Sequence, residues 1–310
     1  MVSDTMRKAA VVDITKFMKE EPTISTGLAA IRTLLKALEN SKATTATELN
    51  AELDLVVVAM ESTDFSSTSI RSASDLFRQF ISLAPADLIE QPNFENILKF
   101  YRQRGVQFNK RVACSRDLIC KYSQSFLQDG MCLLTHSYSK VVLAALTNRQ
   151  KTGANFEVFV TESQPDASGR RMHKELQDAG IRSTLVLDSA VGYLMERIDA
   201  VLVGAEGVME TGGIINKIGT LNLALCAKMM SKPVYVMAES IKFVKEYPLN
   251  QTDIPEEFKY RTSVRRGKQD LSSEHPEVDY TPPSFITLLF TDLGILTPAA
   301  VGEELIKLYT

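Results

Sequence analysis

Apolar side chains recur at helical spacing through residues 1–128. Each set repeats at intervals of three or four residues, which places its members on one face of a helix. Pro85 and Pro92 separate two of these helices, and Thr47 followed by Glu48 predicts the start of another. We therefore predict a helical N-terminal domain whose apolar faces pack as a core. The sets are Leu28, Ile31, Leu35 and Leu38; Leu76, Phe77, Phe80 and Ile81; Phe94, Ile97, Leu98 and Tyr101; and Leu118, Ile119, Tyr122 and Phe126.

The pattern changes at Asp129-Gly130, where short apolar runs begin to alternate with helix-like stretches. Regular alternation of strands and helices predicts a parallel sheet with right-handed crossovers and helices on both faces. The fold class is therefore α/β, with a helical domain over 1–128 and a Rossmann-like, doubly wound domain over 129–310. The predicted strands are residues 131–134, 156–160, 183–187, 200–203 and 233–238.

Residues 200–220 are predicted to pass from a strand through a loop into a helix start, with a tight turn at Gly212 and Gly213. A long, charged, irregular segment follows Ala238 and reaches about Pro283. We expect such a segment to be functional or poorly ordered. Two helices are predicted after it, over residues 281–294 and 297–310.

Composition excludes several classes of protein. The chain is 45% hydrophobic and 24% charged, with a formal net charge of −3. These values are typical of a globular protein, and the charge does not favour nucleic acid or an anionic membrane. No apolar run reaches the length of a membrane span, and the N-terminal segment lacks the apolar core of a secretory signal. We therefore expect a cytoplasmic protein with reduced, mostly buried cysteines, no metal and no cofactor.

Polar side chains follow four of the predicted strands. Because the carboxyl ends of parallel strands meet at one edge of the sheet, we expect these segments to converge. The helix N-termini beyond them supply backbone N–H groups suited to a phosphate. The sequence therefore predicts a pocket for a small anionic ligand, such as a phosphorylated sugar or nucleotide. The segments are Thr135-His136-Ser137-Tyr138, Thr161-Glu162-Ser163-Gln164, Asp188-Ser189, and residues 204–217 with Glu206, Asn216 and Lys217.

Structural interpretations stand beside these functional ones. Thr135, Ser137 and Asp188 could contact a ligand, or they could cap the helices that follow them. Lys217 near a helix start opposes the helix dipole, which favours an anionic partner, either Glu206 or a bound phosphate.

His136 could act as a general base, although a hydrogen-bonded pocket histidine is the commoner case. A serine hydrolase is poorly supported because the chain has no G-x-S-x-G elbow.

Several long blocks of the sequence together carry a resemblance to a known family. They are similar to the alpha subunits of eukaryotic translation initiation factor 2B, over nearly the whole chain. The resemblance implies a regulatory subunit of a guanine-nucleotide exchange factor that reloads initiation factor 2 with GTP. It further implies a homodimer that assembles with the beta and delta subunits and helps sense the phosphorylated alpha subunit of initiation factor 2. Exchange catalysis then belongs to another subunit. The blocks are AAIRTLL, LTHSYS, VTESQPDASG, VGAEGVMETGGIINKIGT, AESIKFVKEYPLNQTDIPEEFKY and FTDLGILTPAAVGEELIKLY.

The same blocks resemble, more distantly, methylthioribose-1-phosphate isomerase and ribose-1,5-bisphosphate isomerase. Those enzymes have a cysteine where this chain has Ser137 and an aspartate where it has Glu206. A serine needs an activating base to replace a thiol, and a longer carboxylate is misplaced for proton transfer. Asn216, Lys217 and the block around Arg71 still match ligand-binding segments of the enzymes. The resemblance thus implies a pocket that keeps binding and loses turnover.

These observations give one main hypothesis and two rivals. The main hypothesis is a non-enzymatic regulatory subunit without cofactor or metal, whose partners are a second copy, the beta and delta subunits, the phosphorylated alpha subunit of initiation factor 2 and a phosphorylated small molecule. The rivals are a sugar-phosphate isomerase and a metabolite-sensing regulator. The candidate ligand-binding residues are Arg71, Thr135, His136, Ser137, Glu162, Asp188, Glu206, Asn216 and Lys217.

Overall fold

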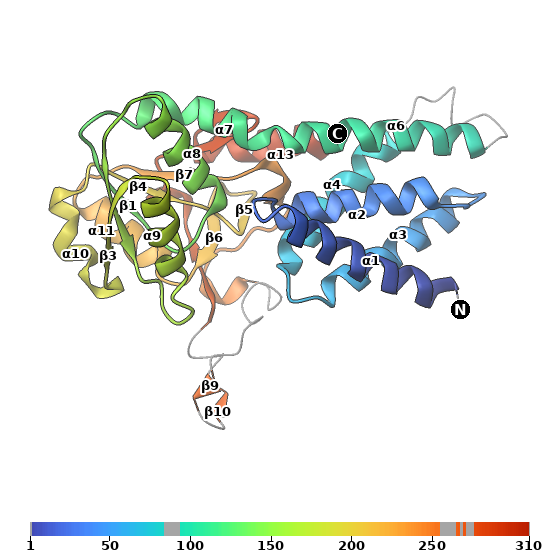
Figure 1. Cartoon of the computed structure of the whole chain (residues 1–310), viewed down its shortest axis with the longest axis horizontal. Coiled ribbons are helices and arrows are strands. Elements are labelled where there is room, and N and C mark those ends of the chain that lie inside the picture. The colour runs from blue at the N-terminus through green and yellow to red at the C-terminus, as the bar shows by residue number, and fades with distance from the viewer. Residues whose placement is uncertain (1, 84–93, 255–264, 267–268, 271–275, 310) are drawn as a thin grey trace. The chain divides into compact units, whose positions relative to one another are not determined.

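The computed structural model of the chain describes residues 2–83, 94–254, 265–266, 269–270 and 276–309 (Figure 1). Two compact units share these residues. The first comprises residues 1–114 and 308–310, and the second comprises residues 115–307. Across the described residues, no helix is both long enough and apolar enough to cross a membrane.

The first unit is helical, as predicted. Helix α2 packs against the other four described helices of this unit. Its core residues Ile31 and Leu34 are fully buried. A β-carbon at Gly105 would lie 2.9 Å from Leu35 Cδ1, so a glycine there lets α6 approach α2 closely. The helices are α1 (Val2–Glu20), α2 (Thr26–Asn40), α3 (Ala46–Glu61), α4 (Ser67–Ser82) and α6 (Phe94–Ala113).

The start of α3 differs from the prediction by two residues. Thr45, not Thr47, is the N-cap, because Thr45 has extended backbone and its hydroxyl accepts the N–H of Glu48. Hydrogen bonds from Thr44 lower the pKa of the Glu48 carboxylate. Pro85 and Pro92 lie outside the described residues.

The second unit is built on a seven-stranded sheet in the order β13-β12-β7-β4-β1-β2-β3. Every neighbouring pair is parallel except β12 and β13. All five predicted strands are present, and the α/β fold class is confirmed. The strands are β1 (Cys132–Thr135), β2 (Glu157–Thr161), β3 (Arg182–Val186), β4 (Ala200–Val203), β7 (Val234–Met237), β12 (Leu288–Thr291) and β13 (Gly294–Leu296).

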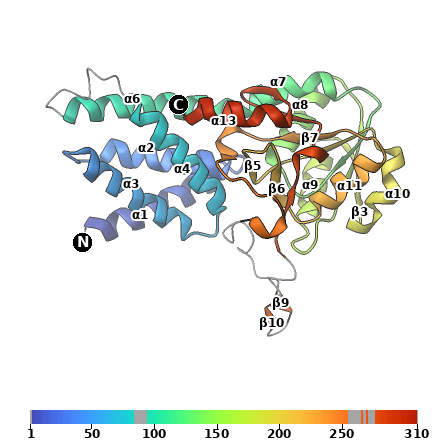
Figure 2. The ribbon, with the colours of Figure 1, turned by 180° about the vertical axis from the view of Figure 1, so that it is seen from behind.

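Helices cover both faces of this sheet (Figures 1 and 2). From β1 the chain steps outward through β2 to β3, whereas from β4 it steps the opposite way to β7. Right-handed crossovers therefore place the intervening helices on opposite faces. Helices α7, α8 and α9 contact one another in series, and α10 contacts α11. These helices are α7 (Ser115–Ser123), α8 (Lys140–Lys151), α9 (Ser168–Asp178), α10 (Val191–Leu194) and α11 (Thr220–Met229).

The second unit begins earlier than the domain boundary predicted at residue 129. Ile119, Cys120 and Leu127 belong to the core under the sheet. Phe126 stacks edge-to-face with Phe290 of β12, with ring centroids 4.9 Å apart. The apolar stripe over 118–126 thus packs on the sheet of the second unit, which places helix α7 in that unit.

A smaller, four-stranded sheet occupies much of the segment predicted as a loop before Lys217. Its order is β11-β6-β5-β8. Gly212 has a φ of +82°, and a β-carbon there would lie 2.1 Å from the Pro298 carbonyl oxygen, so this turn requires glycine. The strands are β5 (Gly207–Met209), β6 (Ile214–Lys217), β8 (Phe243–Val244) and β11 (Val278–Thr281).

The helix predicted over residues 281–294 is wrong. This stretch contains the end of β11, a short 3-10 turn (Pro283–Phe285), strand β12 and the start of β13. Its apolar run is a strand buried between β7 and β13, where a continuous hydrophobic stretch is typical. Gly294, with φ at +136°, opens the antiparallel strand β13. The last predicted helix is confirmed as α13 (Val301–Tyr309), which follows a 3-10 turn (Pro298–Ala300).

Candidate functional site

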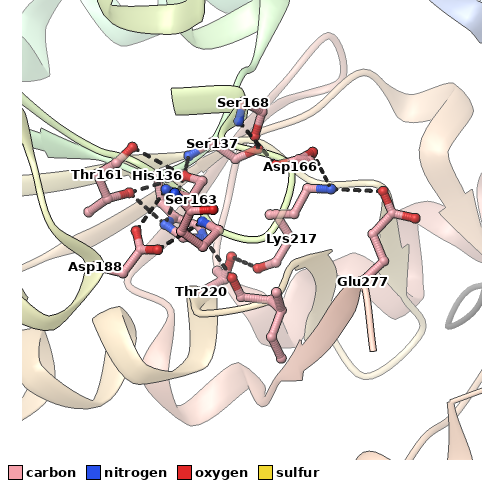
Figure 3. A network of polar contacts seen from close by, with 12 residues as sticks. His136, Ser137, Thr161, Ser163, Asp166, Ser168, Asp188, Lys217, Thr220 and Glu277 are labelled. Carbon is pink, nitrogen blue, oxygen red and sulfur yellow. Dashed lines mark hydrogen bonds and ion pairs between the residues drawn. The ribbon is translucent and has the colours of Figure 1, made fainter. Parts of the chain in front are cut away.

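The strand order locates the site. In β3-β2-β1-β4-β7-β12 the direction of strand addition reverses between β1 and β4, and doubly wound sheets bind ligands outside the carboxyl ends of strands at such a reversal. The loops after β1, β2 and β3 and the small sheet bring a network of polar side chains together there (Figure 3).

His136 is the most buried titratable group of this network, with 3% exposure. Its Nε2 lies 2.8 Å from the Ile218 carbonyl oxygen, and its Nδ1 lies 2.7 Å from Thr161 Oγ1. A carbonyl only accepts, so Nε2 carries the proton and Nδ1 accepts from the Thr161 hydroxyl. Burial lowers the pKa of His136, which keeps the ring neutral. His136 is therefore a hydrogen-bonded histidine whose Nδ1 faces the hydroxyls of Thr161 and, at 3.3 Å, Ser163.

Ser137 has left-handed backbone, with φ at +64°. Its N–H donates to Ser163 Oγ at 2.6 Å, and its Oγ is 2.9 Å from Ser168 Oγ. A nucleophilic serine needs a base on its hydroxyl, and this hydroxyl contacts another hydroxyl instead. The geometry lets Ser137 hold a ligand oxygen.

Helix capping does not explain the polar residues after β1. The N-cap of α8 is Ser139, whose hydroxyl accepts the N–H of Val142. Thr135 is the last residue of β1 and is fully buried, and its Oγ1 has no hydrogen-bond partner within the described parts of the chain. The capping interpretation of Thr135 and Ser137 is therefore wrong.

Asp188 holds the loop after β2. Its two carboxylate oxygens accept the backbone N–H groups of Ser163 at 2.7 Å and Gln164 at 2.8 Å. It caps no helix, because the 3-10 turn Asp188–Ala190 has Leu187 as its N-cap and α10 has Ala190, and neither has a side-chain cap. Glu162 lies in the same loop, where it pairs with Arg170 of α9 at 2.7 Å.

Lys217 ends strand β6 and is paired with two carboxylates, Asp166 at 2.8 Å and Glu277 at 2.9 Å. The sequence predicts an anionic partner, Glu206 or a bound phosphate, whereas the carboxylates found on Lys217 are Asp166 and Glu277. Burial alone would lower the pKa of Lys217, but hydrogen bonds to Asp166 and Glu277 outweigh it and raise the pKa. Burial would raise the pKa of Asp166, but its bonds to Lys217 and Ser168 lower it. Lys217 and Asp166 are therefore both charged at neutral pH.

Asp279 is a second residue that the sequence reasoning missed. It lies on β11 opposite Asn216, and its Oδ2 accepts the N–H groups of Gly219 and Leu221 at 2.8 and 3.1 Å. Asp279 thereby caps α11, whose own N-cap residue Gly219 has no side chain. Burial raises the pKa of Asp279 to about 7. Among the described residues, nothing forms a hydrogen bond with its Oδ1.

Figure 3 does not label the three remaining candidate residues, Asn216, Glu206 and Arg71. Asn216 is buried and donates to Thr220 Oγ1 at 3.1 Å. Glu206 is half-buried at the start of the small sheet, where its N–H donates to the Ile215 carbonyl. Arg71 lies on α4 of the first unit and pairs with Glu61 at 2.9 Å, so its role at the pocket stays a prediction.

The described residues include no metal site, and the cysteines are free thiols. Within the described ranges, no group of His, Cys, Asp or Glu side chains could hold a metal ion. The cysteines are free thiols, of which Cys120 is buried and Cys114 is exposed, so the prediction of mostly buried thiols was too broad. Burial raises the pKa of Cys120 to about 11, which disfavours its thiolate.

The fold and the site can now be compared with known proteins. The model of the Initiation factor 2 subunit family matches residues 19–298, and the chain belongs to this family. In particular, the chain is 58% identical over 292 residues to translation initiation factor eIF2B subunit alpha of Caenorhabditis elegans, covering 94% of this chain and 95% of that one. It is 40% identical over 310 residues to the same subunit of Dictyostelium discoideum, covering 96% of each. The resemblance seen in the sequence is confirmed.

More distant relatives share the fold. A ribose 1,5-bisphosphate isomerase of Archaeoglobus fulgidus is 32% identical over 198 residues, covering 63% of each chain. Among solved structures, a chain of the tetrameric eIF2B-beta2-delta2 complex from C. thermophilum superposes with a TM-score of 0.73 at 17% identity, covering 99% of this chain and 98% of that chain.

Proposed function

We propose that this chain is a regulatory, non-catalytic alpha subunit of the guanine-nucleotide exchange factor for translation initiation factor 2, acting in the cytoplasm. The observation that carries the proposal is 58% identity over 94% of the chain to an eIF2B subunit alpha. The site supports it, because Ser137 lacks a base and His136 has both ring nitrogens engaged. The test is to add the purified chain to an exchange factor that lacks its alpha subunit. Restored response to phosphorylated initiation factor 2 is expected, and no restoration would refute the proposal.

Assembly begins with a second copy of the chain. Helices α10 and α11 contact each other, and Tyr193 and Met229 on them are 86% and 82% exposed. Leu187, Leu225 and Met230, in or beside the same segments, are exposed as well, and we propose that the five residues form one apolar patch. An exposed apolar patch of this kind marks an interaction surface. The proposal assigns it to a symmetric homodimer, in which the patch meets its own copy.

Sedimentation of the purified chain tests the dimer. The double change Tyr193→Ser and Met229→Ser is expected to give a monomer at micromolar concentration, because it removes the largest exposed apolar groups. Ile306→Ser, another exposed apolar position at 57% exposure, is the matched control and should leave the dimer intact. A wild-type monomer would refute the assignment.

The dimer is proposed to join the beta and delta subunits and to help bind the phosphorylated alpha subunit of initiation factor 2. The likeness to a chain of a beta–delta complex supports a shared subunit architecture. Neither a membrane nor a nucleic acid is among the proposed partners. Co-purification of beta and delta subunits with the wild-type chain, and its loss with the monomeric variant, would test this assembly.

The pocket is proposed to bind a phosphorylated small molecule without converting it. Lys217 supplies a positive charge, and the hydroxyls of Ser137, Ser163 and Ser168 supply hydrogen-bond donors. Calorimetric titration with ribose 5-phosphate and with AMP tests the ligand class. Binding that is lost in Lys217→Ala is expected, and no heat with either compound would refute the pocket.

The alternative is a sugar-phosphate isomerase, favoured by the 32% identity to a ribose 1,5-bisphosphate isomerase. Incubation with ribose 1,5-bisphosphate or methylthioribose 1-phosphate decides between the two. The regulatory proposal expects no ketose product. Turnover that disappears in Ser137→Ala would favour the enzyme.

A further inference from the structure

Asp166 places a carboxylate of the chain itself inside the pocket. Its Oδ2 lies 2.8 Å from Lys217 Nζ, and its Oδ1 accepts the N–H of Ser168 at 3.0 Å (Figure 3). The side chain of Lys217 is only 13% exposed, whereas that of Asp166 is 41% exposed. The more accessible partner of this ion pair is thus the one that can leave.

The groups around Asp166 are those that would bind an external anion. Helix α9 has 11 residues and starts at Ser168, and its N-cap Ala167 provides no side-chain hydrogen bond. The dipole of such a helix start attracts negative charge, and the Ser168 N–H, which now donates to Asp166 Oδ1, would be available to another anion if Asp166 left. Lys217 adds a buried cation, and the paired hydroxyls of Ser137 and Ser168 lie beside it, 2.9 Å apart. Asp166 supplies the charge and the oxygens that a phosphate would otherwise supply.

We propose that Asp166 is an intramolecular occupant of the anion subsite, and that a phosphomonoester binds by displacing it from Lys217 and from the start of α9. Asp166 then sets both affinity and selectivity. The apparent dissociation constant equals the intrinsic one divided by the fraction of chains in which Asp166 has left the subsite. A dianion gains more from Lys217 than a carboxylate does, so phosphomonoesters compete while simple carboxylic acids do not.

Glu277 has a different role in this exchange. It pairs with Lys217 at 2.9 Å from the opposite side, so it keeps the lysine charged and oriented while Asp166 leaves. None of the hydrogen bonds described above joins Glu277 to the N-terminus of α9. Removing the charge of Glu277 should therefore change ligand affinity much less than removing that of Asp166.

Calorimetric titration with ribose 5-phosphate tests this inference, which rests on the proposed ligand pocket. Asp166→Asn keeps an oxygen for the Ser168 N–H and removes the negative charge that faces Lys217. We expect it to bind ribose 5-phosphate about tenfold more tightly than the wild type, a difference of about 1.4 kcal/mol. Glu277→Gln should change affinity by less than about threefold. Glu196→Gln, an exposed acid of the same unit, controls for net charge and should leave affinity unchanged.

The outcomes separate the two proposals. If the wild type binds and Asp166→Asn binds equally or more weakly, Asp166 is only a structural partner and the exchange is refuted while the pocket stands. If neither the wild type nor Asp166→Asn binds ribose 5-phosphate or inorganic phosphate, the pocket and the exchange both fail. A crystal structure of the complex gives a second readout. A phosphate oxygen on Lys217 Nζ with Asp166 displaced is expected, and an intact Asp166–Lys217 pair beside bound ligand would overturn the inference.

Discussion

The two sheets of the second unit contribute different groups to one site. Besides the carboxylates of Asp166 and Asp188 in its loops, the large sheet supplies neutral groups, His136, Thr161 and Ser163, whose hydrogen bonds are made within the fold. The small sheet supplies the cation Lys217 and the buried Asp279, whose Oδ1 has no hydrogen bond with any described residue. Complete hydrogen bonding fixes an arrangement, whereas incomplete bonding leaves it responsive to protons and ligands. The neutral groups His136, Thr161 and Ser163 are therefore held in place, whereas Asp279 of the small sheet can gain or lose a proton.

The largest effect is expected at Gly169, near the start of α9, where the packing leaves no space for a side chain. A β-carbon at Gly169 would lie 1.7 Å from the Thr161 carbonyl oxygen, so α9 could not start where it does. Gly169→Ala should lower the free energy of unfolding by about 3–5 kcal/mol, measured by urea denaturation. Gly153→Ala is the control, because its β-carbon meets open space although φ is +95°. Equal losses in the two variants would show that the packing of this loop is not tight.

The next largest effect is expected at His136, and it tests whether the buried ring is neutral. His136→Ala leaves the Thr161 hydroxyl and the Ile218 carbonyl without their partner, and should cost about 2–3 kcal/mol at pH 7.5. Because burial lowers the pKa of His136, its contribution is present above the unfolded pKa of about 6.5 and is lost as pH falls. Urea midpoints between pH 5.5 and 7.5 should show the gap between wild type and variant narrowing toward low pH. If the difference in urea midpoint between wild type and His136→Ala did not change with pH, the buried ring of His136 would not be neutral.

Asp279 should respond to pH with the opposite sign. Its pKa is raised to about 7, so its contribution to stability is fully present below the unfolded value of 3.8 and is lost as pH rises toward 7. Asp279→Asn keeps an oxygen for the start of α11 and removes the buried charge. At pH 8 the variant should be more stable by about 1 kcal/mol, and this advantage should shrink as pH falls to 5. Thermal unfolding at the two pH values checks it, and a variant less stable at pH 8 would refute the assignment.

The smallest effect on stability is expected at Glu277, the second carboxylate that pairs with Lys217. The Glu277 side chain is 25% exposed, and Lys217 keeps Asp166 when Glu277 is changed. Glu277→Gln should therefore lower the free energy of unfolding by less than about 1 kcal/mol, as for partly solvated ion pairs. Thermal denaturation at low salt measures it. A loss above about 2 kcal/mol would show that Glu277 anchors the small sheet.

The large sheet could be predicted from the sequence because its strands are short apolar runs, each followed by a helical pattern. Residues 156–160 and 200–203 show this, and both are strands. The run at 288–291 was misread as a helix, since a buried strand and a buried helix share the same apolar composition. Only its pairing with β7 and β13 distinguishes them, and pairing between distant segments is not visible in one sequence.

The site was predicted in part for the same reason. Segments directly after strands, such as His136-Ser137 and Asp188, were found because strand ends converge. Asp279 and Glu277 were missed, since they lie on or beside β11, next to a charged segment with no periodic pattern. Asp166 was within a recognised block, but nothing in the sequence shows that it reaches Lys217, 51 positions away.

The cap that Asp279 places on α11 links the site to the order in which the chain is synthesised. Residues 219–221 leave the ribosome well before residue 279, and β7 waits similarly for its neighbour β12. A nascent chain that stops before residue 277 lacks one of the two carboxylates that pair with Lys217, the cap of α11 and one neighbour of strand β7. These contacts across the small sheet therefore form only once the chain is almost complete, and truncated products would present an incompletely packed surface to cellular proteases.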